Sequence, residues 1–325
     1  MAVEVLQPGL LTTVQDAGRT GHAAEGWRSC GVCDPLAARV ANQMAGNTGN
    51  TAVLELTGIG GSFRFTACTV AAFCGPDAVG TVNGRAVRAA FPLLMMPGDV
   101  LSVQLRDGLR AYIAVHGGFD VPAVMGSRST DMACGTGGFE GRALRKGDLL
   151  PTVACAPDAF FPRLHQRASR LTLLRPFVHP AARQPESAAV IRVIPGPQED
   201  RFTDAGLHTF YSGYYTIRQD SNRMGLRLNG PAVEARGTTD ILSDAIVYGS
   251  VQIASDGQPI IMLADHQTTG GYAKPATVIP SDLPVLAQLR PGRRVVFRAV
   301  SLSEAAAAYR ADADMREAVA RALTE

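Results

Sequence analysis

The sequence predicts a mainly β protein, because its apolar residues fall in short runs that end at Gly, Pro, Asp or Asn. These runs are roughly four to eight residues long and recur at intervals of about ten residues, often with no helical pattern between them. Antiparallel barrels or sandwiches fit this spacing better than a doubly wound α/β sheet. In chain order, the predicted strands include VEVL (3–6), LLTTV (10–14), AVLEL (52–56), FRF (63–65), TVAAF (69–73), DVLSVQL (99–105), RAYIAVHGG (110–118), VIRVIPG (190–196), PIIMLAD (259–265) and RRVVFRAV (293–300).

Four helices are predicted between and after the strands. Asp34 suits the N-cap of the first, Pro35 its first position and Gly46 its end, which predicts a helix over residues 34–46. The second opens at Pro197 with an acidic first turn, as the helix dipole favours. The third is short and capped by Ser281 (281–289), and the last is the alanine-rich C-terminal segment (303–325).

Length and composition suggest two domains, because 325 residues exceed one domain of typical size. Residues 151–187 contain six prolines and no glycine, which is typical of an interdomain linker with ordered parts. Within this linker, LTLLRPFV (171–178) is a candidate edge strand. The expected division is a β-barrel-like domain (1–150), the linker (151–187), a second barrel domain (188–302) and a C-terminal helix (303–325).

The charge balance argues against nucleic acid as a partner, because 31 basic and 29 acidic side chains give a net charge of only +2. The same charge balance argues against binding to a membrane surface. No window of the sequence approaches the ~18 consecutive apolar residues of a membrane-spanning helix. The N-terminal residues lack the pattern of a signal peptide, so the six cysteines are expected to be reduced thiols. We therefore expect a cytoplasmic protein with no nucleic-acid and no membrane partner.

Several common motifs are absent. The sequence has no GxxxxGK[ST] phosphate loop, no helix after the glycines at 58–61 to hold a dinucleotide, and no histidine pair spaced to bind zinc. Cys30 and Cys33 form a lone CxxC, which leaves thiol chemistry at a helix N-terminus as an alternative to two ordinary loop cysteines. We expect no metal site.

Two glycine-punctuated loops in the first half of the chain carry candidate site residues. VQDAGRTGH (14–22) presents Asp16 and Arg19, and its alternative is an ordinary turn closed by an ion pair between these two residues. Residues 116–142 place two glycine doublets around Ser127, Arg128 and Ser129. Backbone of this composition can approach a ligand closely while hydroxyls and a guanidinium hold its anionic part, and its alternative is a long surface loop.

The segment LADHQTTGGYAKPATVIPSDLP (263–284) is the most informative stretch of the chain. It follows a predicted strand and gathers hydrogen-bonding side chains that are costly if buried without partners and unnecessary if merely solvated. Lys274 is one of only two lysines, the other being Lys146, and a compact ammonium in so arginine-rich a chain hints at a specific role. Arg223, just before a predicted strand, is expected to reach the same site. The other candidates in this segment are Asp265, His266, Gln267, Thr268, Thr269, Gly270, Gly271 and Tyr272.

Taken together and in this order, these segments resemble the biotin-dependent carboxyltransferase family in its allophanate hydrolase subunit 2 branch. The resemblance covers nearly the whole chain. The segments that carry it are QPGLLTTVQDAGRTGH, DPLAARVANQMAGN, LELT, GSRST, GGFEGRAL, VIPGPQ, SNRMGLRLNGP, QPIIMLADHQTTGGYAKPATVI and the DLP that follows.

The resemblance implies two cyclophilin-like β-barrel domains and a role as the C subunit of an ATP-dependent 5-oxoprolinase, a hydrolase of a cyclic amide. Such an enzyme opens 5-oxo-L-proline to L-glutamate and includes a kinase-inhibitor-like B-subunit homologue and an A-subunit homologue. ATP is the implied cofactor, bound mainly with a partner subunit. One alternative is the carboxyltransferase half of a biotin-dependent urea or allophanate-type carboxylase, which would use biotin. The other is a non-enzymatic regulator that binds a kinase-inhibitor protein.

The residues and the resemblance together predict how a site of this kind would work. Lys274 and Arg128 would stabilise developing negative charge, and Asp265 and His266 would handle protons or orient groups. The residues expected to bind and position the substrate are Gln267, Thr268, Thr269, Gly270, Gly271, Tyr272, Ser127, Ser129 and Arg223, with Asp16 and Arg19 as secondary candidates.

Overall fold

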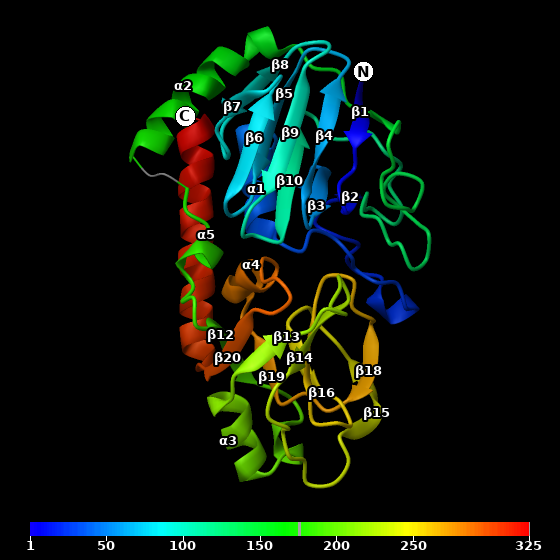
Figure 1. Cartoon of the computed structure of the whole chain (residues 1–325), viewed down its shortest axis with the longest axis vertical. Helices are drawn as coiled ribbons and strands as arrows, with labels where there is room; N and C mark the ends of the chain where they lie inside the picture. Colours follow the sequence, from blue (N-terminus) through cyan, green and yellow to red (C-terminus); the bar gives the residue numbers. More distant parts are fainter. Residues whose placement is uncertain (175–176, 325) are drawn as a thin grey trace. The chain divides into compact units, whose positions relative to one another are not determined.

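The computed structural model describes residues 1–174 and 177–324 and divides the chain into two compact units. Unit 1 comprises Met1–Thr20, Cys30–Ala182 and Met315–Glu325, and unit 2 comprises Gly21–Ser29 and Arg183–Asp314. Figure 1 shows the elements coloured along the chain. The structure confirms a mainly β protein with few helices and a C-terminal helix.

Unit 1 contains two antiparallel sheets. A six-stranded sheet has the order β11-β1-β4-β9-β6-β7, and a five-stranded sheet has the order β2-β3-β10-β5-β8. The strands are β1 (Ala2–Gln7), β2 (Leu11–Gln15), β3 (Val53–Thr57), β4 (Gly60–Phe65), β5 (Thr69–Cys74), β6 (Ala78–Val82), β7 (Arg85–Val87), β8 (Leu93–Met95), β9 (Val100–Leu105), β10 (Arg110–Val115) and β11 (Leu149–Pro151).

Side chains alternate in direction along the strands of unit 1 and so contribute to two separate hydrophobic cores. In β5, Ala71 and Phe73 face the core shared by the two sheets, which also includes Phe63 and Leu101 of the six-stranded sheet. The intervening β5 residues Val70, Ala72 and Cys74 face the opposite way and pack with α1. The five-stranded sheet is therefore covered on both faces, which explains why β5 and β10 are buried at every position.

Helix α1 (Pro35–Met44) confirms the predicted first helix. The carboxylate of Asp34 accepts hydrogen bonds from the backbone N–H groups of Leu36 and Ala37, so it is the N-cap, and Pro35 occupies the first turn. Cys33 and Cys30 are both buried just before this helix, where the Cys33 N–H donates to Glu55 Oε2 at 2.8 Å.

The prediction of an edge strand at 171–178 is wrong for the residues that the structure describes. Residues up to 174 belong to helix α2 (Phe161–Leu174), and residues 175–176 lie outside the described part of the chain. Leu164 and Ala168 of α2 are buried against the α1 core with Leu171 partly buried beside them, which is a helical spacing of four and three residues. Short 3₁₀ helices at Pro157–Ala159 and Pro180–Arg183 flank α2.

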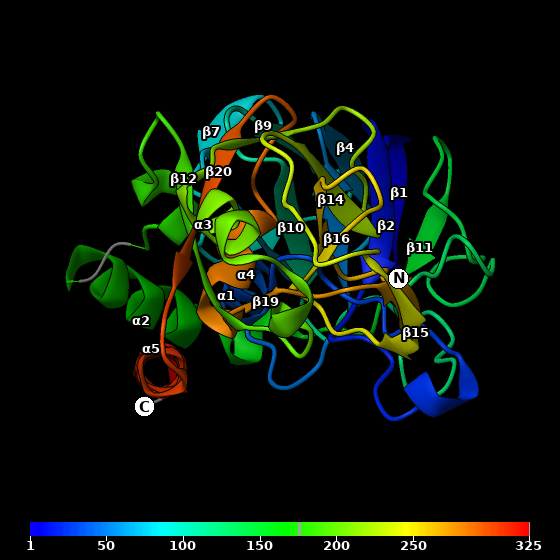
Figure 2. The same ribbon diagram turned by 90° about the horizontal axis from the view of Figure 1, so that it is seen from below.

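Unit 2 is built around a closed barrel of seven strands in the order β12-β19-β16-β17-β14-β13-β20. Strands β12 and β20 run side by side and parallel, and the other described pairs are antiparallel (Figure 2). A separate two-stranded sheet pairs β15 with β18. The strands are β12 (Ala189–Pro195), β13 (Tyr215–Ile217), β14 (Gly225–Asn229), β15 (Asp240–Ala245), β16 (Ser250–Ile253), β17 (Pro259–Met262), β18 (Thr269–Tyr272), β19 (Ala276–Val278) and β20 (Arg294–Ala299).

The remaining helices differ from expectation at their starts. The second predicted helix begins as a 3₁₀ turn (Glu199–Arg201) and becomes α3 (Asp204–Ser212) only after Thr203, whose hydroxyl accepts from the Gly206 N–H. Ser281 is not a cap, because its hydroxyl is buried with no partner among the described residues. The other helices are the 3₁₀ turns Ala23–Glu25 and Pro280–Asp282, α4 (Leu283–Leu286) and α5 (Leu302–Thr324).

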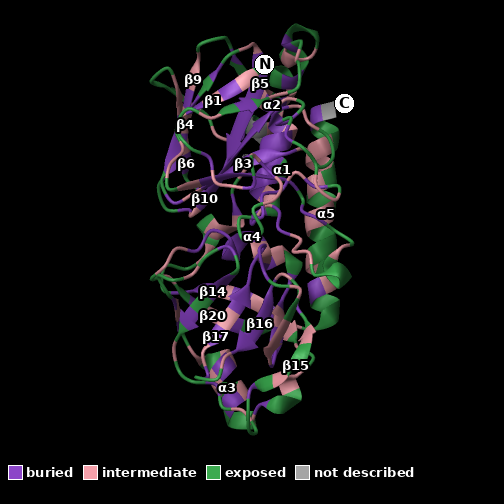
Figure 3. Cartoon of the chain, turned by 90° about the vertical axis from the view of Figure 1, so that its right-hand side faces the viewer, coloured by how far each residue is buried: buried purple, intermediate pink, exposed green. Residues whose placement is uncertain are grey.

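Buried residues concentrate in the strands, and α5 is mostly exposed (Figure 3). Over residues 1–174 and 177–324, no helix is both long and apolar enough to cross a membrane. The same residues include no group of three or more His, Cys, Asp or Glu side chains placed to hold a metal ion.

Candidate active site

Arg223 and Asp265 form a buried ion pair at the paired ends of β14 and β17. The ladder between these strands continues past Gly225 and Met262, because the Asp265 N–H donates to the Arg223 carbonyl at 2.9 Å. Arg223 Nε and Nη2 donate to the two carboxylate oxygens of Asp265, each at 2.8 Å. Both oxygens of Asp265 are thereby engaged in a bidentate pair, which favours a role in orientation over proton transfer.

His266 is buried next to this pair and has one defined tautomer. Its Nδ1 lies 2.6 Å from the Gln267 carbonyl oxygen, which can only accept, so Nδ1 carries the proton and Nε2 carries the lone pair of the neutral ring. Burial lowers the pKa of His266 and outweighs the hydrogen bond to Gln267 and the charge of Asp265, which both raise this pKa; the nearby Arg28 cation adds to the lowering. The ring is therefore neutral near pH 7, with a nitrogen able to accept a proton.

The Lys274 cluster consists of Lys274, Asp244 and Gln198. The Lys274 side chain is 3% exposed, and its Nζ donates to Asp244 Oδ2 at 2.9 Å. Gln198 Nε2 donates to the same oxygen at 3.0 Å, while its Oε1 accepts from the Lys274 backbone N–H at 3.2 Å. The hydrogen bond from Lys274 is the main cause that lowers the pKa of Asp244 to about 2, and the bond from Gln198 adds to it. The cluster thus holds a buried ammonium against an ionised carboxylate.

The predicted substrate-binding residues between His266 and Lys274 form β18 and the turn before it. Gln267 and Thr269 are exposed, and β18 pairs with β15 so that Gly270 lies opposite Asp244. An added Cβ at Gly270 would lie 2.4 Å from Ile246 Cδ1 and 2.6 Å from Gln252 Nε2, so the ends of these two side chains would have to shift. Neither Gly270 nor Gly271 has a positive φ, so the backbone conformation does not require glycine at either position.

Asp16 organises the corresponding segments of unit 1. The hydroxyls of Ser127 and Ser129 donate to Asp16 Oδ1 at 2.6 and 2.7 Å, and the Gly18 N–H donates to the same oxygen at 2.9 Å. The Arg128 N–H donates to Oδ2 at 2.7 Å. The two serines that the sequence suggested as anion ligands therefore donate to an internal carboxylate, which ties the two loops together.

The two arginines of these loops also bind backbone carbonyls. Arg19 is 1% exposed, and its Nε and Nη2 donate to Val124 O and Ser129 O. Arg128 is half-buried, and its Nε donates to Val121 O at 2.9 Å. The glycine doublets at 117–118 and 137–138 all have positive φ, so these turns do require glycine.

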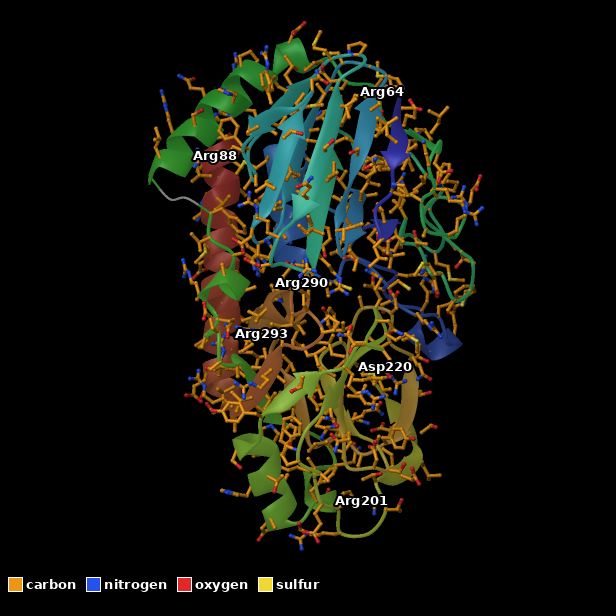
Figure 4. All side chains as sticks on the ribbon, viewed as in Figure 1. Arg64, Arg88, Arg201, Asp220, Arg290 and Arg293 are labelled. Atoms are coloured by element: carbon orange, nitrogen blue, oxygen red, sulfur yellow. The ribbon has the colours of Figure 1, made fainter. Side chains whose placement is uncertain are left out.

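The structure thus groups the predicted residues by unit. Arg223, Asp265, His266 and Lys274 belong to unit 2, and Asp16, Arg19, Ser127, Arg128 and Ser129 belong to unit 1. In the described part of the chain, no hydrogen bond or ion pair joins Lys274 to Asp265 or His266. Asp220, which precedes Arg223 in the sequence and is labelled in Figure 4, accepts hydrogen bonds from Arg218, and both residues are exposed.

Sequence reasoning missed Asp244, Gln198 and Arg28. Asp244 is 30 residues from Lys274, and Gln198 is 76 residues away. One signal was present for Asp244, since it lies in DILSDA, an acidic run in the chain just before the glycine-rich segment. Gln198 ends the segment VIPGPQ, one of those that carry the family resemblance, but nothing in that segment ties it to Lys274, which only the tertiary fold brings close. Arg28 carried no signal, because only the fold brings it near His266.

Comparison with known proteins assigns this chain to a family. Residues 25–299 match the family described as "Carboxyltransferase domain, subdomain A and B", so the chain belongs to the carboxyltransferase domain family. The C subunit of 5-oxoprolinase from Escherichia coli (strain K12) is 35% identical over 304 residues, 93% of each chain. The C subunit of 5-oxoprolinase from Haemophilus influenzae is 35% identical over 309 residues, 94% of this chain and 93% of its own.

A solved structure agrees with this assignment. The crystal structure of the K. lactis urea amidolyase matches 98% of this chain and 20% of its own, with a TM-score of 0.85 and 30% identity. The carboxyltransferase resemblance and the mainly β fold predicted from the sequence motifs are therefore confirmed.

Proposed function

We propose that this chain is the C subunit of an ATP-dependent 5-oxoprolinase, which opens 5-oxo-L-proline to L-glutamate together with homologues of the A and B subunits. The observation that carries this proposal is the match of 35% identity to the C subunit of 5-oxoprolinase over 93% of both chains. This match spans both proteins nearly end to end, whereas the match to urea amidolyase covers only part of a larger enzyme. It therefore gives stronger support for a role as the C subunit.

The chemistry of the reaction suits the groups of unit 2. The ring amide of 5-oxoproline has a poor leaving group, and phosphorylation of its carbonyl oxygen by ATP makes it labile. Negative charge then develops on oxygen, and a buried ammonium such as that of Lys274 stabilises it more than a solvated one does. ATP would lie mainly on a partner protein, because this chain has no GxxxxGK[ST] phosphate loop.

The other predicted roles follow from the geometry of each residue. His266 is the proposed proton acceptor, because its ring is neutral and Nε2 holds its lone pair. Asp265 would orient Arg223, and the exposed residues Gln267 and Thr269 would position the substrate. The assignment of Arg128 to anion stabilisation stays a prediction from the sequence.

Reconstitution tests this proposal. The chain would be co-expressed with its neighbouring open reading frames, and glutamate release from 5-oxoproline would be measured with and without ATP. We expect glutamate only when all partners and ATP are present. A complex that assembles and releases no glutamate would contradict the proposed activity.

A second candidate function has its own support in the match to urea amidolyase. A carboxyltransferase using carboxybiotin would need a biotin carrier on another chain, because this one has no AMKM-type biotinylation motif. A requirement for bicarbonate and an avidin-reactive partner would favour this function. A non-enzymatic regulator of a kinase-inhibitor protein would instead bind a B-subunit homologue and show no activity in any mixture.

A further inference from the structure

The Lys274 ammonium is held from two sides by residues distant in sequence. Asp244 Oδ2 accepts from Nζ, and Gln198 joins the same carboxylate oxygen to the Lys274 backbone. The Gln198 N–H also donates to the Lys274 carbonyl at 3.2 Å, so Gln198 is itself fixed to the backbone it supports. The three residues form a closed ring of hydrogen bonds.

Asp244 is fixed in the same way. Its Oδ1 accepts from the Ala245 N–H at 2.8 Å while Oδ2 faces Lys274 and Gln198, so the carboxylate is held at both oxygens. The Asp244 side chain is 46% exposed, and that of Lys274 is 3% exposed. The carboxylate is therefore accessible to solvent, while the ammonium depends on its protein partners.

We propose that Asp244 and Gln198 are positioning residues, which hold the Lys274 ammonium in place and aim its remaining donors at a carboxylate or other oxyanion of the substrate. An ammonium has three donors, and in the described part of the chain the only hydrogen bond of Lys274 Nζ goes to Asp244. Two donors are thus left for a ligand. The identification of the oxyanion as 5-oxoproline or a species formed from it rests on the proposed function.

Substitution of Asp244 or Gln198 should leave the Lys274 side chain in the site but make its ammonium more mobile. Asp244→Asn keeps the shape of the side chain and removes its charge. Gln198→Met keeps its length and removes both side-chain hydrogen bonds. Asp240→Asn is the matched control, because Asp240 is an exposed residue of the same strand, β15, and its carboxylate accepts only from Thr238 Oγ1 among described residues.

The first measurement uses the full chain alone. The chain has only two lysines, so labelling with ¹⁵N-lysine gives two Nζ signals, and Lys274→Met assigns them. Exchange of the Nζ protons with water should be slower at Lys274 than at the exposed Lys146. Asp244→Asn and Gln198→Met should each speed exchange at Lys274 by about tenfold or more, with no change at Lys146 and none in Asp240→Asn.

The second measurement uses the reconstituted complex. If Lys274 meets an oxyanion that is present in both substrate and transition state, Asp244→Asn and Gln198→Met should raise KM. If it meets charge that develops only in the transition state, they should lower kcat at unchanged KM. In either case kcat/KM should fall by about tenfold or more, and Asp240→Asn should match the unaltered complex.

The two measurements test the positioning role of Asp244 and Gln198 separately from the proposed 5-oxoprolinase function. Unchanged Nζ exchange at Lys274 in either variant overturns the positioning role, whatever the activity. Altered exchange with unaltered kcat/KM in an active complex also overturns it, because the ring would then be structural only. A complex that is inactive on 5-oxoproline contradicts the proposed function, and the exchange experiment still decides whether Asp244 and Gln198 hold the ammonium.

Discussion

Lys274 Nζ lies 2.9 Å from Asp244 Oδ2, so one of the two lysines of the chain is buried with its charge matched by a carboxylate from a neighbouring strand. Lys146, the other lysine, is exposed and has no such partner among the residues described. A buried charge of this kind persists only where it is compensated, and such sites are often functional. This pair is therefore the centre of the proposed site.

The ionisation of Asp244 should report directly on Lys274. Because the ammonium is the main cause of the lowered pKa of Asp244, Lys274→Met should raise this pKa from about 2 toward the ordinary value of 3.8. Lys146→Met should leave it unchanged. Carboxyl-carbon NMR of aspartate-labelled protein measures both, and an Asp244 titration that is the same in all three proteins would argue against the pair.

His266 should make stability depend on pH in a defined direction. Its folded-state pKa is lowered below the ordinary value of 6.5, mainly by burial. As the pH falls through 6.5, the unfolded chain takes up a proton that the folded chain resists, so stability should fall until the pH reaches the lowered folded-state pKa. Above 6.5 this residue should cause no pH dependence.

Urea unfolding of variants tests this effect of His266. His266→Gln should flatten the loss of stability below pH 6.5, whereas His208→Gln, at an exposed position of α3, should keep it. Equal pH profiles for His266→Gln and the unaltered chain would show that the imidazole is not held neutral.

Asp16 should matter for stability, because it satisfies two hydroxyls and two backbone N–H groups inside unit 1. Asp16→Ala should lower the free energy of unfolding by about 3 kcal/mol, since these donors are left without their acceptor. Asp120→Ala, at an exposed position, should change it by less than about 0.5 kcal/mol. A small effect at Asp16, measured by urea unfolding, would instead favour a ligand-binding role for the loop.

Much of the fold could be predicted because local patterns agree with the tertiary structure. The apolar runs became strands, and Asp34 with Pro35 marked the start of α1. Helix α2 was missed because Pro162 and several basic residues obscure its apolar stripe, although Leu164, Ala168 and Leu171 have helical spacing. The six prolines of residues 151–187 led to the prediction of a linker with ordered parts, and α2 lies within this segment.

The site was predictable only in part, because a sequence shows candidate groups and not their partners. Lys274 and Asp265 could be named from their unusual context, but Asp244 and Gln198 could not, since strand pairing and loop packing bring them to Lys274. Ser127 and Ser129 have the composition of anion ligands, yet their hydroxyls donate to Asp16. The fold decides which hydrogen-bond partner each buried polar group finds, and composition alone does not show this.

The proposed role of Lys274 is tested most sharply by ATP-dependent glutamate release from the reconstituted complex that carries Lys274→Met, with Lys146→Met as the matched control. We expect the complex with Lys274→Met to assemble and to lose about 100-fold or more in kcat/KM, because a buried positive charge beside the developing oxyanion is removed. The complex with Lys146→Met should keep its activity within about twofold. Full activity with Lys274→Met would show that the buried ammonium does not stabilise the developing charge.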